Sequence, residues 1–111
     1  MTDCVFCGIA TGAIDATLVA EGEGWVAFRD LEPQAPAHVL VVPRAHVSSL
    51  TALSSEALGG ELLIACATVA RAEGLTDGYR VVTNTGADGG QAVPHLHFHV
   101  LGGRRMGWPP G

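Results

Sequence analysis

Three of the five histidines in this chain of 111 residues lie close together, in the stretch PHLHFHVLGG at positions 94–103. His95, His97 and His99 alternate there with apolar residues. Successive side chains of a β-strand point to opposite faces, so the pattern predicts a strand over 95–101 with imidazoles on one face and core residues on the other. An exposed strand face rarely carries three histidines in register. Imidazole serves in proton transfer, metal ligation or nucleophilic attack near neutral pH, and the rest of the chain must decide among these roles.

The composition limits the class of protein. A chain of 111 residues with 48% hydrophobic content suits one compact domain over 1–111 with a modest core. The net charge of −5 gives no sequence-wide basic surface, so we expect no nucleic-acid partner and only local contacts to any phosphate. The sequence has neither a membrane-spanning run nor a signal-peptide pattern, and we expect a cytoplasmic protein without a membrane partner. Three cysteines in such a chain argue against a disulfide framework.

The order of the expected elements indicates the fold class. TLVAE and WVAFRD, separated by residues 22–24, are typical of a β-hairpin, and HVLVVP and YRVVTN are typical of further strands. Ser54 or Ser55 could cap a helix that runs to about Arg71 or Glu73 and ends at Gly74. The inner face of this helix would carry Leu58, Leu62, Ala65, Cys66 and Val69. With a short N-terminal helix or turn, this order predicts an α+β fold with a mainly antiparallel five-stranded sheet and one long helix.

A glycine-rich loop, TNTGADGGQAVP, comes directly before the histidines. Gly86, Gly89 and Gly90 would let backbone N–H groups approach an anion closely, although the loop lacks the Lys-Ser/Thr ending of a P-loop. A plain hairpin connection is the simpler interpretation of the loop taken alone. Its attachment to the histidines favours phosphate binding, because the two features would then address the same point in space.

The spacing of Cys4 and Cys7, in CVFC, allows both thiolates to bind one metal ion from a tight turn. A closed tetrahedral site needs two more ligands, for which His46 and one histidine of 95–99 are candidates. The alternative is a pair of reduced cysteines packed under the N-terminal turn. The spacing alone leaves both open.

Three further residues have competing interpretations. His38, in APAH, stands alone, and such a histidine is usually structural and hydrogen-bonded to a neighbouring carbonyl. Asp30 lies between a strand and a turn, where aspartate commonly accepts hydrogen bonds from its own backbone. Trp108, between Gly107 and two prolines at the C-terminus, suggests docking on this chain or on a partner, because chain ends fray unless they are held.

The stretch HLHFHVL has the form His-φ-His-φ-His-φ-φ, where φ is apolar, and resembles the signature of the histidine-triad (HIT) superfamily of nucleotide hydrolases and transferases. FRDLEPQAPAHVLVVPRAH, RVVTNTGADGGQAVPH and LGGRRMGWPPG are similar to its purine-nucleoside phosphoramidase (Hint-like) branch, so the resemblance covers nearly the whole chain. It implies the HIT fold and a two-fold homodimer whose sheets join, with the tail of residues 104–111 reaching the partner subunit.

The resemblance also implies an activity, the hydrolysis of the P–N bond in nucleoside 5′-phosphoramidates such as AMP-amines or AMP-lysine. His97 matches the nucleophile that forms a nucleotidyl-histidine intermediate, which water then releases as the nucleoside monophosphate. His99 matches the residue that contacts the phosphoryl oxygens, and His95 and His38 match the supporting histidines. No metal would take part in the chemical step.

The nucleotide contacts follow from the same resemblance, with AMP or GMP as expected ligands. Asp30 would accept from the ribose hydroxyls, Asn84 would lie near ribose and phosphate, and Trp108 would lie beside the leaving group. The developing phosphoryl charge would be stabilised by Gln91 and by the N–H groups of Ala92 and Val93. An apolar slot for the purine would be formed by Val5, Phe6, Phe28, Leu31 and Leu40.

Two residues depart from the family pattern. Ala92 stands where some relatives have serine, and Pro94 replaces a commoner tyrosine, which affects leaving-group protonation and rate rather than the backbone cradle. Related uridylyltransferases and several bacterial members bind zinc through a C-x-x-C, a later histidine and the first triad histidine. That comparison implies a structural zinc ion at Cys4, Cys7, His46 and His95, which would hold Val5 and Phe6 against the nucleotide site.

Three alternatives to a phosphoramidase remain. The first is a dinucleoside polyphosphate hydrolase, against which the GWPPG ending argues. The second is a nucleotide-binding regulatory or scaffold protein with residual catalysis, which turnover would distinguish. The third is a zinc-stabilised interaction module, which would leave the glycine-rich loop, His97 and His99 without a role.

Overall fold

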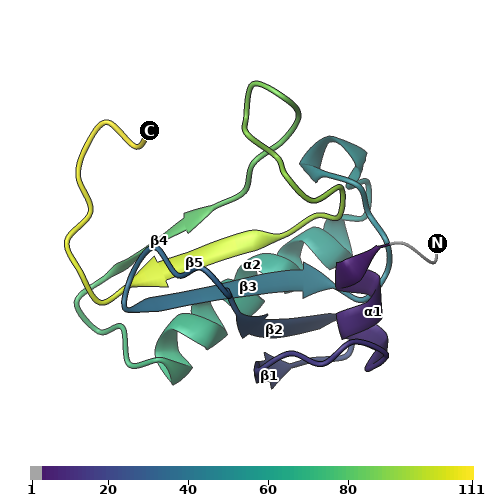
Figure 1. Ribbon diagram of the computed structural model, residues 1–111, viewed down its shortest axis with the longest axis horizontal. Helices are drawn as coiled ribbons and strands as arrows, with labels where there is room; N and C mark the ends of the chain where they lie inside the picture. Colours follow the sequence, from purple (N-terminus) through teal and green to yellow (C-terminus); the bar gives the residue numbers. More distant parts are fainter. Residues whose placement is uncertain (1–3) are drawn as a thin grey trace.

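The computed structural model describes residues 4–111, so residues 1–3 of the expected domain lie outside the described residues. The elements in chain order are α1 (Val5–Thr11), β1 (Leu18–Glu21), β2 (Trp25–Arg29), β3 (Ala37–Pro43), the 3-10 turn η1 (Leu50–Ala52), α2 (Glu56–Ala72), β4 (Tyr79–Val82) and β5 (Phe98–Gly102). The strands form one antiparallel sheet in the order β1-β2-β3-β5-β4 (Figure 1). The expected α+β class and five-stranded sheet are confirmed, and the N-terminal segment is a helix.

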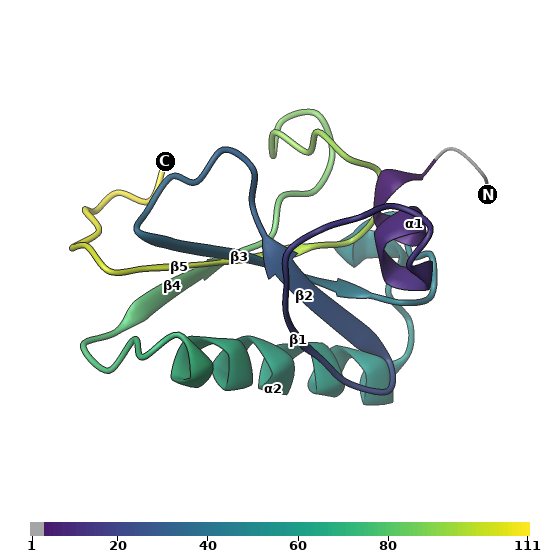
Figure 2. The same cartoon turned by 60° about the horizontal axis from the view of Figure 1, so that its bottom comes forward.

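The two helices lie on opposite faces of the sheet (Figure 2). Between α2 and the sheet lies the larger core, which includes Leu62, Phe98 and Val100. The smaller core lies on the α1 face and consists of Phe6, Val26, Phe28, Leu40 and Val42. Because β3 is central and covered on both sides, all of its residues are buried. No helix among residues 4–111 is long and apolar enough to cross a membrane.

Helix α2 begins and ends near the positions that the sequence predicts. The Ser55 hydroxyl oxygen accepts from the backbone N–H of Leu58 at 3.1 Å, which satisfies one of the donors left free in a first helical turn. Gly74 adopts a left-handed φ of 71° just after the helix, a conformation that favours glycine. Leu58 is half-buried, and the fully buried side of the helix is formed by Leu62, Ala65, Cys66, Val69 and Ala70.

The histidine strand is shorter than the sequence predicts. β5 begins at Phe98, so His95, Leu96 and His97 precede it. Their backbone groups bond to loops instead of strands: Leu96 N–H donates to the Val47 carbonyl at 2.6 Å, and the His97 carbonyl accepts from the Thr83 hydroxyl at 2.8 Å. Strand β4 is also shorter than expected. It ends at Val82, so Thr83 and Asn84 of the expected strand lie in the loop that follows.

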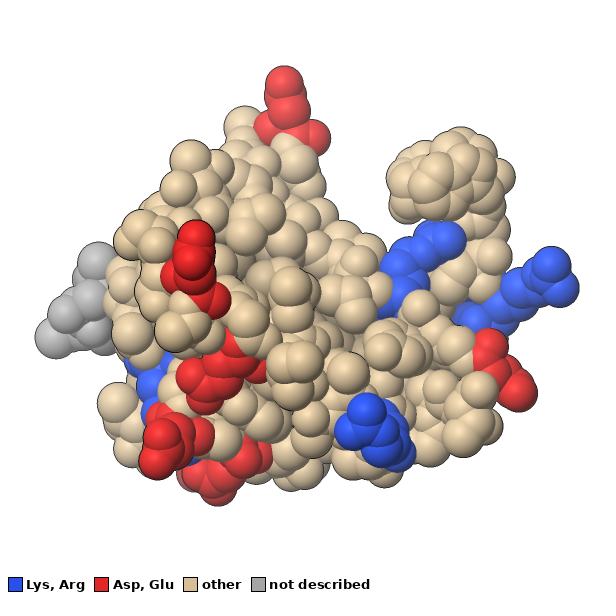
Figure 3. Space-filling model, turned by 180° about the vertical axis from the view of Figure 1, so that it is seen from behind, with Lys and Arg blue, Asp and Glu red and all other residues tan. Residues whose placement is uncertain are grey.

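The predicted division of faces nevertheless holds along this segment. Leu96, Phe98 and Val100 all belong to the core beneath α2. His97 and His99 instead lie beside one another, with ring centroids 5.0 Å apart, and His97 contacts Phe6 of the opposite core. The sheet therefore has an α2 face that supplies stability and an α1 face that carries imidazoles. The C-terminal segment stands away from the body of the molecule beyond the end of β5 (Figure 3).

We predict that Ser55→Ala lowers the free energy of unfolding by about 1 kcal/mol, because the substitution leaves the Leu58 N–H without its side-chain acceptor. Urea unfolding of the two variants Ser55→Ala and Ser54→Ala measures this directly. Ser54 is the matched control, since it is the exposed neighbour that precedes the cap. Equal losses in the two variants would contradict the assignment of Ser55 as the cap.

Candidate active site and metal-binding cluster

His97 has one ring nitrogen held and the other available. Its Nδ1 lies 2.8 Å from the backbone carbonyl oxygen of His95. A carbonyl can only accept, so Nδ1 carries the proton and donates, and the lone pair of the neutral ring is on Nε2. The ring is buried, and Phe6 packs edge-on against it with centroids 5.1 Å apart. An imidazole fixed in this tautomer is able to act as a nucleophile through Nε2.

His38 and His99 form a second ordered pair. The backbone N–H of Gln34 donates to His38 Nδ1 at 3.0 Å, so the proton of a neutral His38 is on Nε2. That Nε2 lies 2.9 Å from His99 Nδ1, which must then accept. The remaining proton of His99 is therefore on its Nε2, where it can donate to a ligand. A single backbone N–H thus sets the tautomer of both rings.

Burial keeps these two rings neutral. It lowers the pKa of His99 to about 4, with His97 and His38 adding to the effect and Asp30 opposing it. Burial also lowers the pKa of His38, again against the influence of Asp30. At pH 7 both rings are uncharged, as the tautomer assignment requires.

Asp30 combines both roles that the sequence suggests for it. Its Oδ1 accepts from the backbone N–H of Glu32 at 2.8 Å, which is the turn contact. Its Oδ2 lies 3.4 Å from His38 Nε2, beside the pair formed by His38 and His99. Donor atoms of Asp30, His38 and His99 lie within 4.8 Å of one another, as in a metal site. Because His38 Nε2 carries a proton and donates it to His99 Nδ1, the two rings form a hydrogen-bonded pair instead, with the Asp30 carboxylate beside it.

Gln91 shapes the glycine-rich loop. Its Nε2 donates to the carbonyls of Ser48 and Val93 at 2.7 and 3.0 Å, and its Oε1 accepts from the Gly86 N–H at 3.1 Å. The amide that we expect to face a phosphoryl group is therefore engaged within the protein. Gly90 has a φ of 77°, which turns the loop back toward Ala92 and the histidines. Asn84 lies at the other end of this loop, next to Thr83.

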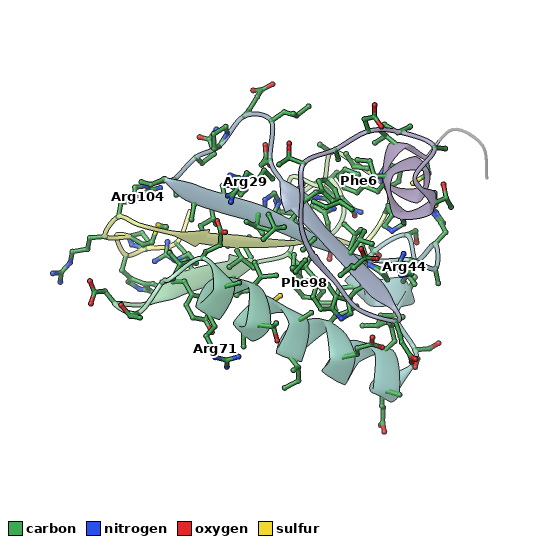
Figure 4. All side chains as sticks on the ribbon, turned by 90° about the horizontal axis from the view of Figure 1, so that it is seen from below. Phe6, Arg29, Arg44, Arg71, Phe98 and Arg104 are labelled. Carbon is green, nitrogen blue, oxygen red and sulfur yellow. The ribbon has the colours of Figure 1, made fainter. Side chains whose placement is uncertain are left out.

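The expected purine slot is brought together in part. Phe6, Phe28 and Leu40 pack in one cluster, and the two phenylalanine rings meet edge-on with centroids 5.3 Å apart. Figure 4 shows the Phe6 side chain at α1, on the side of the sheet opposite α2. Val5 and Leu31 are 41% and 96% exposed, so neither belongs to this cluster. Trp108 is 83% exposed in the single chain.

The four expected zinc ligands do converge. His95 Nδ1 lies 3.2 Å from Cys4 Sγ and 3.5 Å from Cys7 Sγ, and Cys7 Sγ lies 3.3 Å from His46 Nδ1. Tetrahedral zinc with ordinary bond lengths places sulfur and nitrogen ligands about 3.6 Å apart. His95 Nε2 donates to the Pro43 carbonyl at 2.9 Å, which leaves Nδ1 unprotonated for a metal. The donor types, their spacing and this outer hydrogen bond all fit zinc.

Arg44 joins the two halves of that cluster, a role with no signal in the sequence. Its guanidinium donates to the Ala10 carbonyl near the end of α1 at 3.2 Å and to the Glu21 carboxylate at 2.8 Å. Two further bonds reach the Gly22 carbonyl, at 3.0 and 3.2 Å. Arg44 lies two residues before His46, so it ties α1, which contains Cys7 and is capped by Cys4, to the segment that carries the exposed histidine.

This five-stranded antiparallel sheet, with histidines on one face beside a glycine-rich loop, has counterparts among known proteins. A family model described as the HIT domain matches residues 11–106. The chain therefore belongs to the HIT family.

Individual relatives agree with this assignment. A crystal structure of a HIT family hydrolase from Legionella pneumophila is 46% identical, covers 98% of this chain and 100% of its own, and superimposes with a TM-score of 0.94. The 14 kDa zinc-binding protein of Zea mays is 46% identical over 96% of this chain and 87% of its own length. A histidine triad nucleotide-binding protein from Candida albicans has a TM-score of 0.83 at 30% identity, over 96% of this chain and 83% of its own.

We predict that His99→Gln flattens the dependence of stability on pH. The ordinary histidine pKa of 6.5 falls to about 4 at His99 on folding, so between these values the unfolded chain binds a proton that the folded chain does not. The free energy of unfolding of the wild type should therefore fall as the pH is lowered from 7 to 5, and by more than that of His99→Gln. Urea unfolding at several pH values measures both slopes, and parallel profiles would contradict the lowered pKa.

Proposed function

We propose that the protein binds purine nucleotides such as AMP or GMP and hydrolyses the P–N bond of nucleoside 5′-phosphoramidates. The observation that carries this proposal is the tautomer of His97, whose Nδ1 donates to the His95 carbonyl so that Nε2 can attack phosphorus. The names of two relatives support it, since one is a hydrolase and another a nucleotide-binding protein. His99 Nε2–H would bind a phosphoryl oxygen.

The reaction would take two steps. The lone pair of His97 Nε2 forms a bond to the α-phosphorus, and the bond from phosphorus to the amine breaks. The positive charge that develops on the ring is stabilised by its Nδ1–H donation to the His95 carbonyl. Water then attacks phosphorus, releases the nucleoside monophosphate and restores His97. Overall, one water molecule is consumed. Its hydroxyl group ends on phosphorus, and its other proton replaces the proton that the departing amine takes up.

The other contacts would position the nucleotide. Asp30 Oδ2 would accept from the ribose hydroxyls, and His38 would hold His99 in the donating tautomer. Gln91 would keep the loop in shape, so that the N–H groups of Ala92 and Val93 face the phosphate and Asn84 lies near the ribose. The purine would enter between the Phe6, Phe28 and Leu40 cluster and the exposed side chains of Val5 and Leu31.

We propose a structural zinc ion at Cys4, Cys7, His46 and His95. Zinc would supply a cross-link rather than Lewis-acid chemistry, because four protein ligands leave no open position. The cross-link would fix α1 and hence Phe6, which touches the His97 ring. Since both thiols must stay reduced to bind zinc, we place the protein in the cytoplasm.

A homodimer is the third part of the proposal. Apolar side chains are exposed on α2, at Leu63 and Ile64, and on the edge strand β4, at Tyr79 and Val81. An unpaired edge strand beside an apolar helix surface favours pairing with a second copy across a two-fold axis. In such a dimer the exposed Trp108 would reach the partner's site and contact the leaving group.

We predict that His97→Ala lowers turnover of an adenosine phosphoramidate by at least about a thousandfold, because no other group replaces the nucleophile. AMP affinity should stay near the wild-type value, since attack contributes to the transition state more than to ground-state binding. Steady-state kinetics and calorimetry separate the two quantities. Mass spectrometry of rapidly quenched wild type should find AMP on His97. Near-native turnover by His97→Ala, or faster turnover of diadenosine polyphosphates than of phosphoramidates, would overturn the proposal.

We predict about one zinc ion per chain in protein purified without chelator, and none in the double variant Cys4→Ser, Cys7→Ser. The double variant should also unfold at a lower temperature, because the link between α1 and β3 is lost. Elemental analysis and calorimetry measure both. Cys66→Ala is the matched control: Cys66 lies on the buried side of α2, away from the cluster, so that variant should retain zinc whatever its stability. A wild type without zinc and with two titratable thiols would contradict the site.

A further inference from the structure

The strand pairing of the sheet stops just short of His97. Strand β5 begins at Phe98, where its pairing with β3 also ends. On the other side, the last residue of β4, Val82, pairs with His99. The backbone of residues 95–97 therefore has no ladder partner in either neighbouring strand. Contacts other than sheet pairing must fix the position of the proposed nucleophile.

The hydrogen bond that sets the His97 tautomer cannot fix this position. It joins His97 Nδ1 to the backbone carbonyl oxygen of His95, two residues earlier in the chain. Because both groups belong to one short segment, the ring and the segment move together. The place of Nε2 relative to the rest of the site therefore depends on bonds that leave the segment.

Two hydrogen bonds connect the backbone of this segment to distant loops. Leu96 N–H donates to the Val47 carbonyl at 2.6 Å, and the Thr83 hydroxyl donates to the His97 carbonyl at 2.8 Å. The second bond reaches His97 itself, and it depends on a side chain. Among residues 4–111 no other side chain donates to this carbonyl. A valine in place of Thr83 would have nearly the same shape but no hydroxyl to donate.

Thr83 also lies at the start of the glycine-rich loop that would hold the phosphate. Strand β4 ends one residue earlier, and the loop projects from that end before the chain returns to β5 (Figure 1). Gln91 fastens the far end of the loop, because it accepts from the Gly86 N–H at 3.1 Å and donates to the Ser48 carbonyl at 2.7 Å. The Thr83 hydroxyl connects the near end directly to His97.

We propose that Thr83 is a positioning residue for the attack of His97 on phosphorus. The inference rests on the proposed phosphoramidase activity and adds to it a residue that touches neither the nucleotide nor the leaving group. The hydroxyl holds the main chain of His97 in register with the glycine-rich loop, so that Nε2 and the loop N–H donors face the same phosphorus. Attack depends steeply on this alignment, since a displacement of about 1 Å can lower a rate by about a hundredfold.

The test removes the hydroxyl in two ways. Thr83→Val is compared with the wild type, and Thr83→Ala is compared with Thr83→Ser. The two proteins of each pair are of similar size at this position, and only one of them can donate to the His97 carbonyl. Thr83→Ala also serves if Thr83→Val folds poorly, because alanine leaves room for a water molecule to reach the carbonyl.

Single-turnover kinetics with an adenosine 5′-phosphoramidate measure the rate constant of amine release, the step in which His97 attacks. We expect Thr83→Val and Thr83→Ala to lower this constant by about tenfold to a hundredfold, and Thr83→Ser to stay within about threefold of the wild type. Calorimetric titration with AMP counts the functional sites and gives the dissociation constant, which should change by less than about threefold in every variant. A merely structural role would lower the number of functional sites rather than the rate constant per site.

Thr11→Val is the matched control. The Thr11 hydroxyl also donates to a backbone carbonyl, that of Gly8 at 3.1 Å, but Thr11 is exposed at the end of α1. Its substitution should leave the rate constant of amine release unchanged. Equal losses in Thr11→Val and Thr83→Val would contradict a specific role for Thr83.

The outcomes distinguish this inference from the function on which it rests. Wild-type rate constants in both Thr83→Val and Thr83→Ala would overturn the role of Thr83 alone. Equal losses in Thr83→Ser and Thr83→Ala would do the same, as would a loss of AMP affinity in proportion to the loss of rate. Absence of wild-type turnover for every phosphoramidate would overturn the proposed function and this inference with it.

Discussion

His95 is the residue on which the rest of the site depends, because each of its polar groups is committed to a different part of the molecule. Its Nε2 donates to the Pro43 carbonyl at the end of β3, and its Nδ1 faces the thiols of Cys4 and Cys7. Its backbone carbonyl accepts from Nδ1 of His97. A fully buried imidazole with all of these contacts has one conformation available. The position and tautomer of His97 follow from it.

Burying the His38 and His99 rings costs electrostatic free energy, which the rest of the fold must offset. Burial lowers the pKa values of His38 and His99, so these rings lose the favourable charged state open to them in water. The compensation lies on the other face of the sheet, where α2 buries Leu62 and Val69 completely. Separating the two faces allows the α1 face to hold buried imidazoles while the α2 face supplies stability.

The sequence predicts those parts of the structure that depend on local periodicity. The alternation of residues 95–100 correctly divides histidines from core residues, and the serine before α2 correctly locates its start. The start of β5 was predicted wrongly because Leu96 N–H finds its acceptor at Val47, a residue 49 positions earlier in the chain. The engagement of Gln91 with Ser48 is equally non-local. Partners brought together by tertiary folding leave no pattern near either residue.

An acidic chain that binds phosphate, as we propose for this one, must attract an anion without a general positive field. With His38 and His99 neutral, the α1 face offers N–H donors rather than cations: a ring N–H at His99 and backbone amides in the loop that Gln91 shapes. Such donors act over hydrogen-bond distances, so they select geometry more than charge. Three arginines without a carboxylate partner among residues 4–111, Arg80, Arg104 and Arg105, lie instead around the β4 edge. The proposed recognition of the phosphoryl group would therefore depend on how precisely the fold orients these N–H donors rather than on net charge.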